Sequence, residues 1–406
     1  MKILLINHFP LAGSGSGTYT KNLAVSLVTR GHEVAVVLPE NAEDFERVLG
    51  IEFFPVYFTP EDGREAPAGA LPFNFPCFTT HPRSTFSFGD MDPVELGEYI
   101  EAFRSAIKRA VSCFRPDVIH GQHVWILSSL AAGLGIPLVL TVHGTDLMGY
   151  ERWPELGSFA RAAIDASEAV IAISRDNVDL VRRHFPEARD KIVFMRNGYD
   201  PGVFFPEEAG RQGVLSPYGL PEEDYMGKKI VIFAGKLTYA KGVDILLRAV
   251  SSYEKKRPDI LTLIVGDGEE MQMLRGLAEE LGLRGVRFLG NVGQNALRRL
   301  YNISDVDVVP SRREAFGLVA IEAMACGLPV VAADRGGLSD FVSGSVGALV
   351  KPEDPEAFAD AVLRTLDRAE AAGQGWSSDI HGFARGSYAQ DKIIHELEDL
   401  YGRCLG

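Results

Sequence analysis

The stretch VVPSRREAFGLVAIEAMACGLPVVAAD, residues 308–334, decides the fold because it combines a strand, a loop, a helix and a second strand. The apolar run that ends near Pro310 is typical of a buried strand, and polar residues follow it. A helix is expected to begin around residues 316–317 and to end at Gly327 and Pro329, because both types are common just beyond a helix C-terminus. A strand–helix–strand unit requires a parallel sheet, so the stretch predicts an α/β protein.

The same alternation of short apolar runs and amphipathic segments extends through both halves of the 406-residue chain. Apolar runs between helical segments are typical of strands that are buried on both faces of a parallel sheet. The runs are KILLIN, HEVAVVLP, DVIHGQ, PLVLTVHG, AVIAIS and KIVFMRNG in the first half, and KIVIFAG, ILTLIVGD, VRFLGN, VDVVPS and PVVAAD in the second. Residues 202–229, rich in Pro, Gly and Glu, separate the two groups, as expected of a connection between domains.

Two successive doubly wound α/β domains are the simplest interpretation, because 406 residues exceed what one hydrophobic core usually organises. We predict an N-terminal domain over residues 1–203 and a C-terminal domain over residues 204–385. The last amphipathic segment, residues 386–402, can pack back on the first domain or stay on the second.

Residues 59–93 fit neither a strand nor a helix pattern. They contain many prolines and glycines together with five phenylalanines, and the aromatic content argues against disorder. The segment is therefore either a loop that lines a substrate site or a packed excursion of the chain.

Composition and charge exclude several classes of function. A formal net charge of −14 argues against nucleic-acid binding, which requires a basic face. No apolar run has the length of a membrane span or of a signal-peptide core, so we expect a cytoplasmic protein, with peripheral membrane contact left open. The four cysteines have no C-x-x-C spacing, which is typical of a reducing compartment and argues against a zinc site.

The loop and helix within residues 308–334 predict an anion site. Backbone N–H groups of residues 316–318 would point out of a helix N-terminus that lies beyond the carboxyl end of a strand. Glu314 and Glu322 are unusual beside a phosphate unless they accept hydrogen bonds from sugar hydroxyls. The alternative is that both are solvated helix residues, but the apolar context AIEAMA makes an unpaired Glu322 carboxylate costly, which favours the ligand role.

Residues at the ends of other strands of the second half complete this candidate site. Lys236 follows a strand and Lys241 precedes a helix, so both ammonium groups can reach the same sheet edge and stabilise a diphosphate. Two exposed surface lysines are the alternative, and their positions at strand ends favour the site. Gly266, after the next strand, and Asn291 with Val292 would let a base and ribose approach the backbone.

Candidate residues of the first half also follow strands. His143 and Asp146 belong to the run HGTD, where a histidine can donate to a reacting sugar, act as a base, or serve the structure alone. His120 and His123 lack an evident third metal ligand, so structural or acceptor contacts are favoured for them. The pair Asp305 and Asp307 resembles a D-x-D metal motif but begins a strand, so we predict strand-edge roles and no catalytic metal.

The glycine-rich loop after the first strand, HGTD, GKLTYAKG, VGDGEE, FLGNV and the E-x7-E pattern from Glu314 to Glu322 together resemble family 4 retaining glycosyltransferases. The resemblance extends over nearly the whole chain, and its second-half motifs are specific in combination. It implies the GT-B fold, in which two Rossmann-like domains face each other across a cleft. Lys236 departs from the arginine that is more common in this family, and Arg196 departs from a proline before Asn-Gly.

The resemblance implies a role for each matching residue. Glu322 would bind the ribose, Glu314 the donor sugar, the two lysines the diphosphate and His143 the transferred sugar. The expected catalytic residues are His143, Lys236, Lys241 and Glu314. The expected donor contacts are Gly15, Gly17, Gly266, Asn291, Val292, Leu297, Ala315, Phe316, Gly317, Leu318 and Glu322. The expected acceptor contacts are Tyr19, Arg83, His123 and Asp146.

The implied reaction is transfer of a hexosyl group with retention, by front-face attack of an acceptor hydroxyl, without a cofactor or metal. A UDP-sugar is the favoured donor, with GDP- and ADP-sugars left open. The acceptor, a small molecule, glycan or lipid, and the oligomeric state are not determined by the sequence. One alternative is a sugar-nucleotide epimerase or hydrolase of the same architecture, and another is a non-catalytic nucleotide-sugar-binding protein. An NAD-dependent oxidoreductase is a further alternative, but Thr18 stands where G-x-G-x-x-G needs its last glycine.

Overall fold

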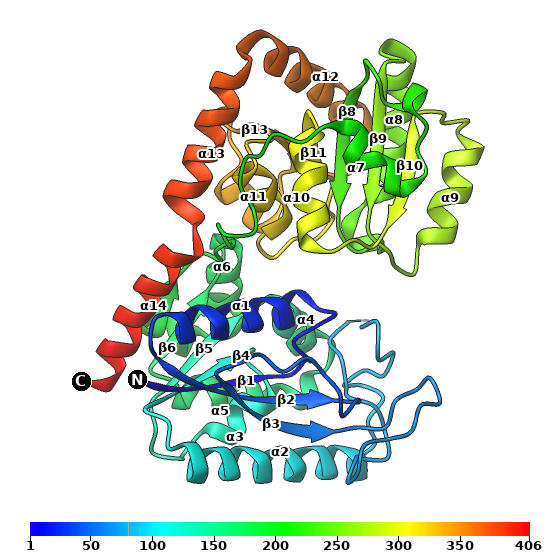
Figure 1. Cartoon of the computed structure of the whole chain (residues 1–406). Helices are drawn as coiled ribbons and strands as arrows, with labels where there is room; N and C mark the ends of the chain where they lie inside the picture. Colours follow the sequence, from blue (N-terminus) through cyan, green and yellow to red (C-terminus); the bar gives the residue numbers. More distant parts are fainter. Residues whose placement is uncertain (80) are drawn as a thin grey trace. The chain divides into compact units, whose positions relative to one another are not determined.

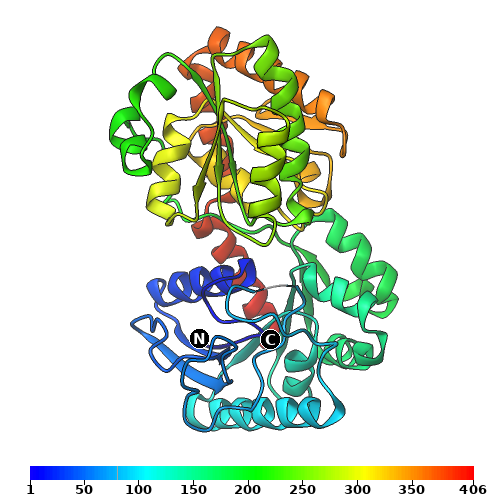
Figure 2. The same ribbon diagram turned by 90° about the vertical axis from the view of Figure 1, so that its right-hand side faces the viewer.

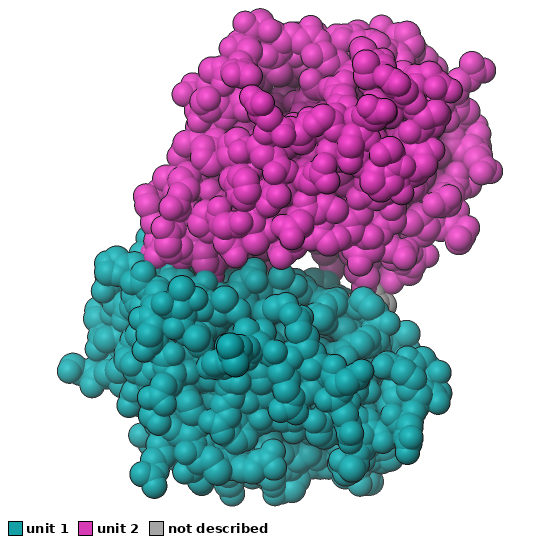
Figure 3. All heavy atoms as spheres, viewed as in Figure 1, with its two compact units in different colours: residues 1–196, 393–406 teal, residues 197–392 magenta. Residues whose placement is uncertain are grey.

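The computed structural model describes residues 1–79 and 81–406 and contains two α/β units, each with its own parallel sheet (Figure 1, Figure 2). Unit 1 comprises Met1–Arg196 and Ile393–Gly406, and unit 2 comprises Asn197–Lys392 (Figure 3). The whole of residues 202–229 lies in unit 2, where Phe204 is buried and the Asn302 amide binds Phe205 and Glu207. This segment is therefore part of the second unit and not only a connection.

The sheet of unit 1 has the strand order β3-β2-β1-β4-β5-β6-β7, and every pair is parallel. In the central strand, Leu4 lies opposite Ala35 of one neighbour and Ile119 of the other. The strands are β1 (Lys2–Asn7), β2 (Glu33–Glu40), β3 (Ile51–Tyr57), β4 (Val118–Gln122), β5 (Leu138–Val142), β6 (Ala169–Ala172) and β7 (Ile192–Phe194).

Helices cover both faces of this sheet, which explains the continuous apolar run of β1. Successive side chains of a strand point to opposite faces, so Leu4 and Ile6 pack with one set of helices and Ile3 and Leu5 with the other. The first set is α2 (Pro93–Phe114), α3 (Ile126–Ala131) and α5 (Gly157–Ala166), and the second is α1 (Gly15–Thr29) and α14 (Gln390–Leu405) (Figure 1). The unit also contains α4 (Thr145–Arg152) and α6 (Arg175–His184).

The C-terminal residues of α14 are an integral part of unit 1. Ile393, Leu397 and Leu400 are buried against the sheet. The segment 386–402 is not one helix, since α13 (Gln374–Tyr388) ends just before Ala389 and α14 begins after it. Its residues from Ile393 onward belong to the first unit.

The aromatic segment 59–93 packs into the core of unit 1. Phe75, Phe78 and Phe88 are almost fully buried in the cluster that includes Phe58 and Trp125. The phenylalanines therefore anchor the chain excursion on the sheet, which favours the packed alternative for the side chains that are buried.

The sheet of unit 2 has the order β10-β9-β8-β11-β12-β13, again with parallel pairs. Its strands are β8 (Lys229–Ala234), β9 (Ile260–Val265), β10 (Val286–Gly290), β11 (Val306–Val309), β12 (Val330–Ala333) and β13 (Gly347–Val350). One face is covered by α8 (Val243–Lys256), α9 (Met271–Glu280) and α12 (Pro355–Ala372), and the other by α10 (Gln294–Ile303) and α11 (Leu318–Ala325) (Figure 1). The short α7 (Arg211–Leu215) precedes the first strand.

The sequence analysis did not identify two edge strands, β3 and β13. The first, IEFFPVY, contains Pro55, which is tolerated because an edge strand needs no N–H donor on its outer side. Most of its side chains are only partly buried. The second, GALV, is only four residues long, and only its first and last residues are buried. The first edge strand therefore lacks the continuous apolar run of the inner strands, and the second is too short to stand out.

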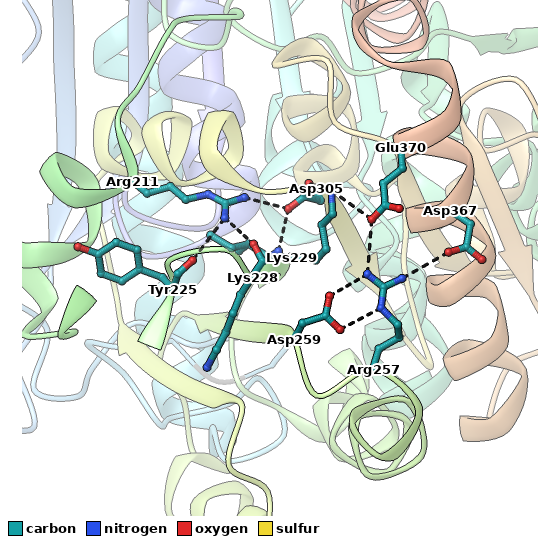
Figure 4. Close-up of polar contacts among 10 residues, drawn as sticks. Arg211, Tyr225, Lys228, Lys229, Arg257, Asp259, Asp305, Asp367 and Glu370 are labelled. Carbon is teal, nitrogen blue, oxygen red and sulfur yellow. Dashed lines mark hydrogen bonds and ion pairs between the residues drawn. The ribbon is translucent and has the colours of Figure 1, made fainter. Parts of the chain in front are cut away.

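A network of ion pairs lies at the amino end of the unit 2 sheet (Figure 4). Asp305 pairs with Arg211 at 3.2 Å and with Lys229 at 3.4 Å, and it accepts the Ile230 N–H at 2.8 Å. Asp305 thus has the strand-edge role that was predicted for it in place of a D-x-D metal site. The network continues through Glu370, Arg257, Asp259 and Asp367.

A buried hydrogen bond joins α14 to the sheet of unit 1. His120 Nδ1 lies 2.6 Å from Tyr401 Oη, and Nε2 lies 2.7 Å from Thr141 Oγ1. Burial lowers the pKa of His120 to about 3, so the ring is neutral and depends on these hydroxyls. On the same helix, Glu398 binds Arg30 and His32, and the Arg30 hydrogen bond contributes most to lowering its pKa to about 2.

We predict that Tyr401→Phe lowers the free energy of unfolding by about 1–3 kcal/mol, because it leaves a buried His120 nitrogen without a partner. Urea denaturation followed by circular dichroism measures the change. Tyr57→Phe is the control, since the Tyr57 hydroxyl makes no hydrogen bond with the described residues. Equal losses in the two variants would contradict the role of the His120–Tyr401 hydrogen bond.

Candidate functional site

In both sheets the strand order reverses beside the first strand of the unit. The reversal lies between β1 and β4 in unit 1, and between β8 and β11 in unit 2. Connections leave such a pair toward opposite sides, so ligands of open α/β sheets bind at its carboxyl end. The candidate residues of each unit are therefore best described from these two strand ends.

An ion pair between Lys241 and Glu314 occupies the reversal point of unit 2. Lys241 Nζ lies 2.7 Å from Glu314 Oε2, and Ser311 Oγ donates to the same oxygen at 3.1 Å. The Glu314 side chain is only 10% exposed, and the Lys241 side chain is 29% exposed. The pair is thus ordered by the fold yet remains within reach of a ligand.

The N-terminus of α11 follows directly after Glu314. Gly317 caps the helix with φ of 96°, and a Cβ on it would lie 2.5 Å from Leu338 Cδ2, so this position requires glycine. The first N–H groups of a helix have no partner within it and carry its positive dipole end. The helix begins at Leu318, one residue later than expected, and the predicted anion site at residues 316–318 would use these N–H groups.

Glu322 is a buried carboxyl group in the middle of α11. It is 8% exposed and makes no hydrogen bond or ion pair with the described residues. Burial raises its pKa to about 8, so the group is mainly protonated at neutral pH. A carboxyl group in this state can exchange hydrogen bonds with hydroxyls at low desolvation cost.

The remaining donor candidates lie on neighbouring strand ends of unit 2. Lys236 follows β8 and is partly buried, and Gly266 follows β9, where its N–H donates to Gly290 O at 2.8 Å. Asn291 is exposed and Val292 partly exposed after β10, before α10 begins, and Leu297 is partly exposed within that helix. Ala315 lies between Glu314 and the α11 cap.

Sequence reasoning missed residues that support the loop between β11 and α11. The Gly337 N–H donates to Glu314 O at 3.3 Å, and a Cβ on Gly336 would lie 1.7 Å from that oxygen. The adjacent glycines of RGGL, after β12, were the available signal. Ser311 and Arg312 were also not singled out, and Arg312 binds Asp244 and Glu353.

In unit 1, His143 lies at the end of β5 beside β4. Its Nε2 lies 3.1 Å from Gln122 Oε1, and its ring packs against Tyr19 with centroids 5.1 Å apart. Burial lowers the pKa of His143 to about 3, so the ring is neutral. With Nε2 donating to the Gln122 carbonyl, Nδ1 carries a lone pair that can accept a hydrogen bond from a hydroxyl.

Several buried polar groups near this strand end have no partner among the described residues. Both ring nitrogens of His123, both amide atoms of Asn7, Nδ1 of His8 and Nε2 of Gln122 belong to this set. His123 also has a positive φ of 146°, uncommon for a non-glycine residue. Buried polar groups are rarely left without partners, so the end of β1 and β4 is suited to a polar ligand. The sequence signal for these residues was their position, since Asn7 and Gln122 end apolar strands and His8 follows one.

Two acceptor candidates from the sequence already have partners. The Asp146 carboxylate accepts hydrogen bonds from the Gly144, Leu147 and Val124 N–H groups and is fully buried. Burial raises its pKa to about 6. It therefore holds two loops in place, and its role as an acceptor contact stays a prediction. Arg83 lies 2.9 Å from Glu40 at the end of β2.

The glycines of the glycine-rich loop at the start of α1 differ in how closely other atoms approach them. A Cβ on Gly17 would lie 2.1 Å from Pro10 O, so packing requires glycine there. Gly15 is exposed with no atom near a Cβ, so packing gives no reason for it. His81 Nε2 lies 3.1 Å from Ala12 O, which ties the loop to the aromatic segment.

Neither a metal site nor a membrane span is evident in the part of the chain that the structure describes. No group of three or more His, Cys, Asp or Glu side chains there could hold a metal ion. No helix there is both long and apolar enough to cross a bilayer.

Comparison with known proteins agrees with this geometry. Residues 13–203 match the family described as Glycosyltransferase Family 4, and residues 221–374 match Glycosyl transferases group 1. An uncharacterized glycosyltransferase of Methanocaldococcus jannaschii is 30% identical, covering 99% of this chain and 98% of the relative. A D-inositol 3-phosphate glycosyltransferase of Mycolicibacterium smegmatis is 32% identical, covering 91% of this chain and 84% of the relative.

A solved structure shares the fold. The sucrose-phosphate synthase of Thermosynechococcus elongatus superposes with a TM-score of 0.79 at 23% identity, covering 99% of this chain and 98% of that one. The chain thus has two parallel-sheet units, family matches in both halves and relatives that it covers almost completely. The chain belongs to the family 4 glycosyltransferases and has the GT-B fold.

Proposed function

We propose that this glycosyltransferase moves a hexosyl group from a UDP-sugar to an acceptor hydroxyl with retention of configuration and without a metal or cofactor. The observation that carries the proposal is the Lys241–Glu314 pair beside the N-terminus of α11. A cation and a helix N-terminus bind a diphosphate, and a carboxylate in the same place accepts hydrogen bonds from sugar hydroxyls. The preference for UDP rests on the family resemblance.

The protein side chains act by positioning and electrostatics. Lys236, Lys241 and the α11 amides stabilise the negative charge that develops on the leaving diphosphate. Glu314 orients the donor sugar, and Glu322 binds the ribose hydroxyls. The acceptor hydroxyl attacks the anomeric carbon on the side of the leaving group, and its proton passes to a phosphate oxygen. No protein nucleophile is required.

Unit 1 binds the acceptor in this proposal. The support is the set of buried polar groups without partners at the ends of β1 and β4. His143 accepts a hydroxyl hydrogen bond at Nδ1, with Tyr19 packed against its ring. The four free cysteines support a reducing compartment, and we propose the cytoplasm.

The other candidate functions receive no support from the comparisons, since the named relatives are glycosyltransferases. An oxidoreductase would also leave the Lys241–Glu314 pair without a role. Acceptor-independent consumption of the donor is the behaviour that would distinguish an epimerase or hydrolase.

We predict that UDP raises the melting temperature more than GDP, ADP or NAD in a thermal-shift screen. A ligand at 100 times its dissociation constant stabilises the folded state by about 2.7 kcal/mol, which such a screen detects. Transfer from UDP-sugars is then followed with a panel of polyol and sugar acceptors, with product configuration read by NMR.

Activity should persist in EDTA, and the new glycosidic bond should keep the donor's anomeric configuration. Stabilisation by NAD alone would overturn the proposal. Inversion of configuration or loss of activity in EDTA would overturn the corresponding part of it.

We predict that Lys241→Ala and Glu314→Gln each lower kcat/KM by at least about 100-fold, because each removes a charged group from the transferred phosphate or sugar. Steady-state kinetics measures the loss, and circular dichroism checks that the fold is intact. Lys256→Ala is the matched control, since this exposed lysine of unit 2 pairs, among the described residues, only with Asp360. Full activity in either site variant would refute the site assignment.

We predict that Glu322→Gln makes the folding stability of the ligand-free protein less dependent on pH. The folded carboxyl group has its pKa raised from 4.5 to about 8, so the unfolded state binds fewer protons between these values. Stability of the wild type therefore falls across this range, by up to about 1.4 kcal/mol per pH unit, and glutamine removes that loss.

Melting temperatures of wild type and variant from pH 5 to 9 test this, with exposed Glu280→Gln as the control. The same Glu322→Gln variant should bind UDP more weakly. Parallel pH profiles of wild type and Glu322→Gln would contradict an ionisation penalty at Glu322.

A further inference from the structure

Arg312 lies in the loop that connects β11 to α11, two residues before Glu314. An arginine in this place would ordinarily be interpreted as a direct ligand of the diphosphate. Its contacts in the folded chain argue for a different role. Its side chain is only 12% exposed, although the neighbouring Arg313 is exposed.

The guanidinium group of Arg312 makes four hydrogen bonds with the protein. Nη1 and Nη2 bind the two Asp244 oxygens at 2.6 and 2.8 Å, and Nε binds Glu353 Oε1 at 2.6 Å. Nη1 also donates to Tyr239 O at 3.1 Å, and the Tyr239 ring lies 4.0 Å from Cζ. Two carboxylates already neutralise this cation, so it offers little charge to a phosphate.

These partners belong to the segment that carries Lys241. Tyr239 and Lys241 are the ends of the short turn before α8, and Asp244 lies in the first turn of that helix. The Arg312 and Arg313 N–H groups donate to Ala240 O of the same turn, at 2.8 and 3.1 Å. Side chain and backbone together therefore join the Glu314 loop to the Lys241 turn.

The ion pairs of Arg312 affect both of its carboxylate partners, Asp244 and Glu353. Burial would raise the pKa of Asp244, but the Arg312 hydrogen bonds hold it below its usual value. Glu353, the third member, has a positive φ of 61°, which costs energy for a non-glycine residue. The fold thus maintains an unfavourable backbone conformation at a residue that binds Arg312.

We propose that Arg312 is a positioning residue that holds the Lys241 turn and the Glu314 loop in the register needed to bind a nucleoside diphosphate, without touching the ligand. The inference rests on the proposed function of the Lys241–Glu314 pair. It predicts that charge alone at position 312 is insufficient, because an ammonium group cannot form the planar two-point contact with Asp244.

Unit 2 offers a matched control for this arginine. Arg257 also binds one aspartate through two nitrogens, Asp259 at 2.8 and 2.9 Å, and it pairs with Glu370 and Asp367 (Figure 4). This cluster lies at the amino end of the sheet, whereas Arg312 lies at the carboxyl end. Arg257→Lys therefore reproduces the chemistry of the change away from the site.

The test compares UDP binding by calorimetry in the full-length wild type, Arg312→Lys and Arg257→Lys. We expect Arg312→Lys to weaken binding about tenfold and to raise KM for the donor more than it lowers kcat. Arg257→Lys should leave the dissociation constant within about twofold of wild type. Circular dichroism and melting curves ensure that only folded protein is compared.

A second variant separates positioning from direct contact. If Arg312 acts through Asp244, Asp244→Asn weakens UDP binding by itself, and the double variant is no weaker than the worse single variant. Additive losses in the double variant would overturn the proposal and indicate that Arg312 touches the ligand. Equal UDP affinity of Arg312→Lys and wild type would overturn only the positioning role. Failure of the wild type to bind any nucleoside diphosphate would overturn the proposed function together with this inference.

Discussion

The parallel pairing of β8 with β11 is the constraint on which the unit 2 site depends. The two strands are separated by three crossovers in the chain, yet they are neighbours in the sheet. Parallel strands end at the same edge, so the turn after β8 and the loop after β11 meet there. Lys241 and Glu314, 73 positions apart, consequently lie 2.7 Å from each other. The contacts of Arg312 with Asp244 and with Ala240 O join the same two segments.

The two ends of the unit 2 sheet are used in different ways. At the amino end, Asp305 and Arg257 belong to an ion network whose members neutralise one another (Figure 4). At the carboxyl end, Glu322 is buried without a hydrogen-bond partner among the described residues. Unit 1 has a comparable carboxyl end, where Asn7 and His123 have side-chain atoms without partners. Polar side chains without partners among the described residues thus lie near the edge at which ligands of this fold class bind.

The inner strands and the α11 segment could be predicted because their signals are local. Continuous apolar runs, such as that of β1, reflect burial on both faces, and the stop at Gly327 reflects helix termination. The edge strand β3 could not be predicted in the same way, since Pro55 and partial exposure weaken its pattern. Glu322 was singled out by its apolar neighbours, and it is indeed buried. That Gln122 Nε2 lacks a partner among the described residues could not be foreseen, because it depends on which strand lies beside β4.

The sequence by itself determined the α/β class, the presence of two sheets, the glycosyltransferase family and the residues that follow each strand, because these depend on periodicity and on short motifs. The tertiary structure alone decided which of those residues act together. It paired Arg312 with Asp244 and Glu353, and so satisfied a cation that would otherwise be expected to bind phosphate. It also placed three backbone N–H groups against the Asp146 carboxylate. The physical reason is that hydrogen-bond partners are fixed by the crossing of distant segments, which no local pattern encodes.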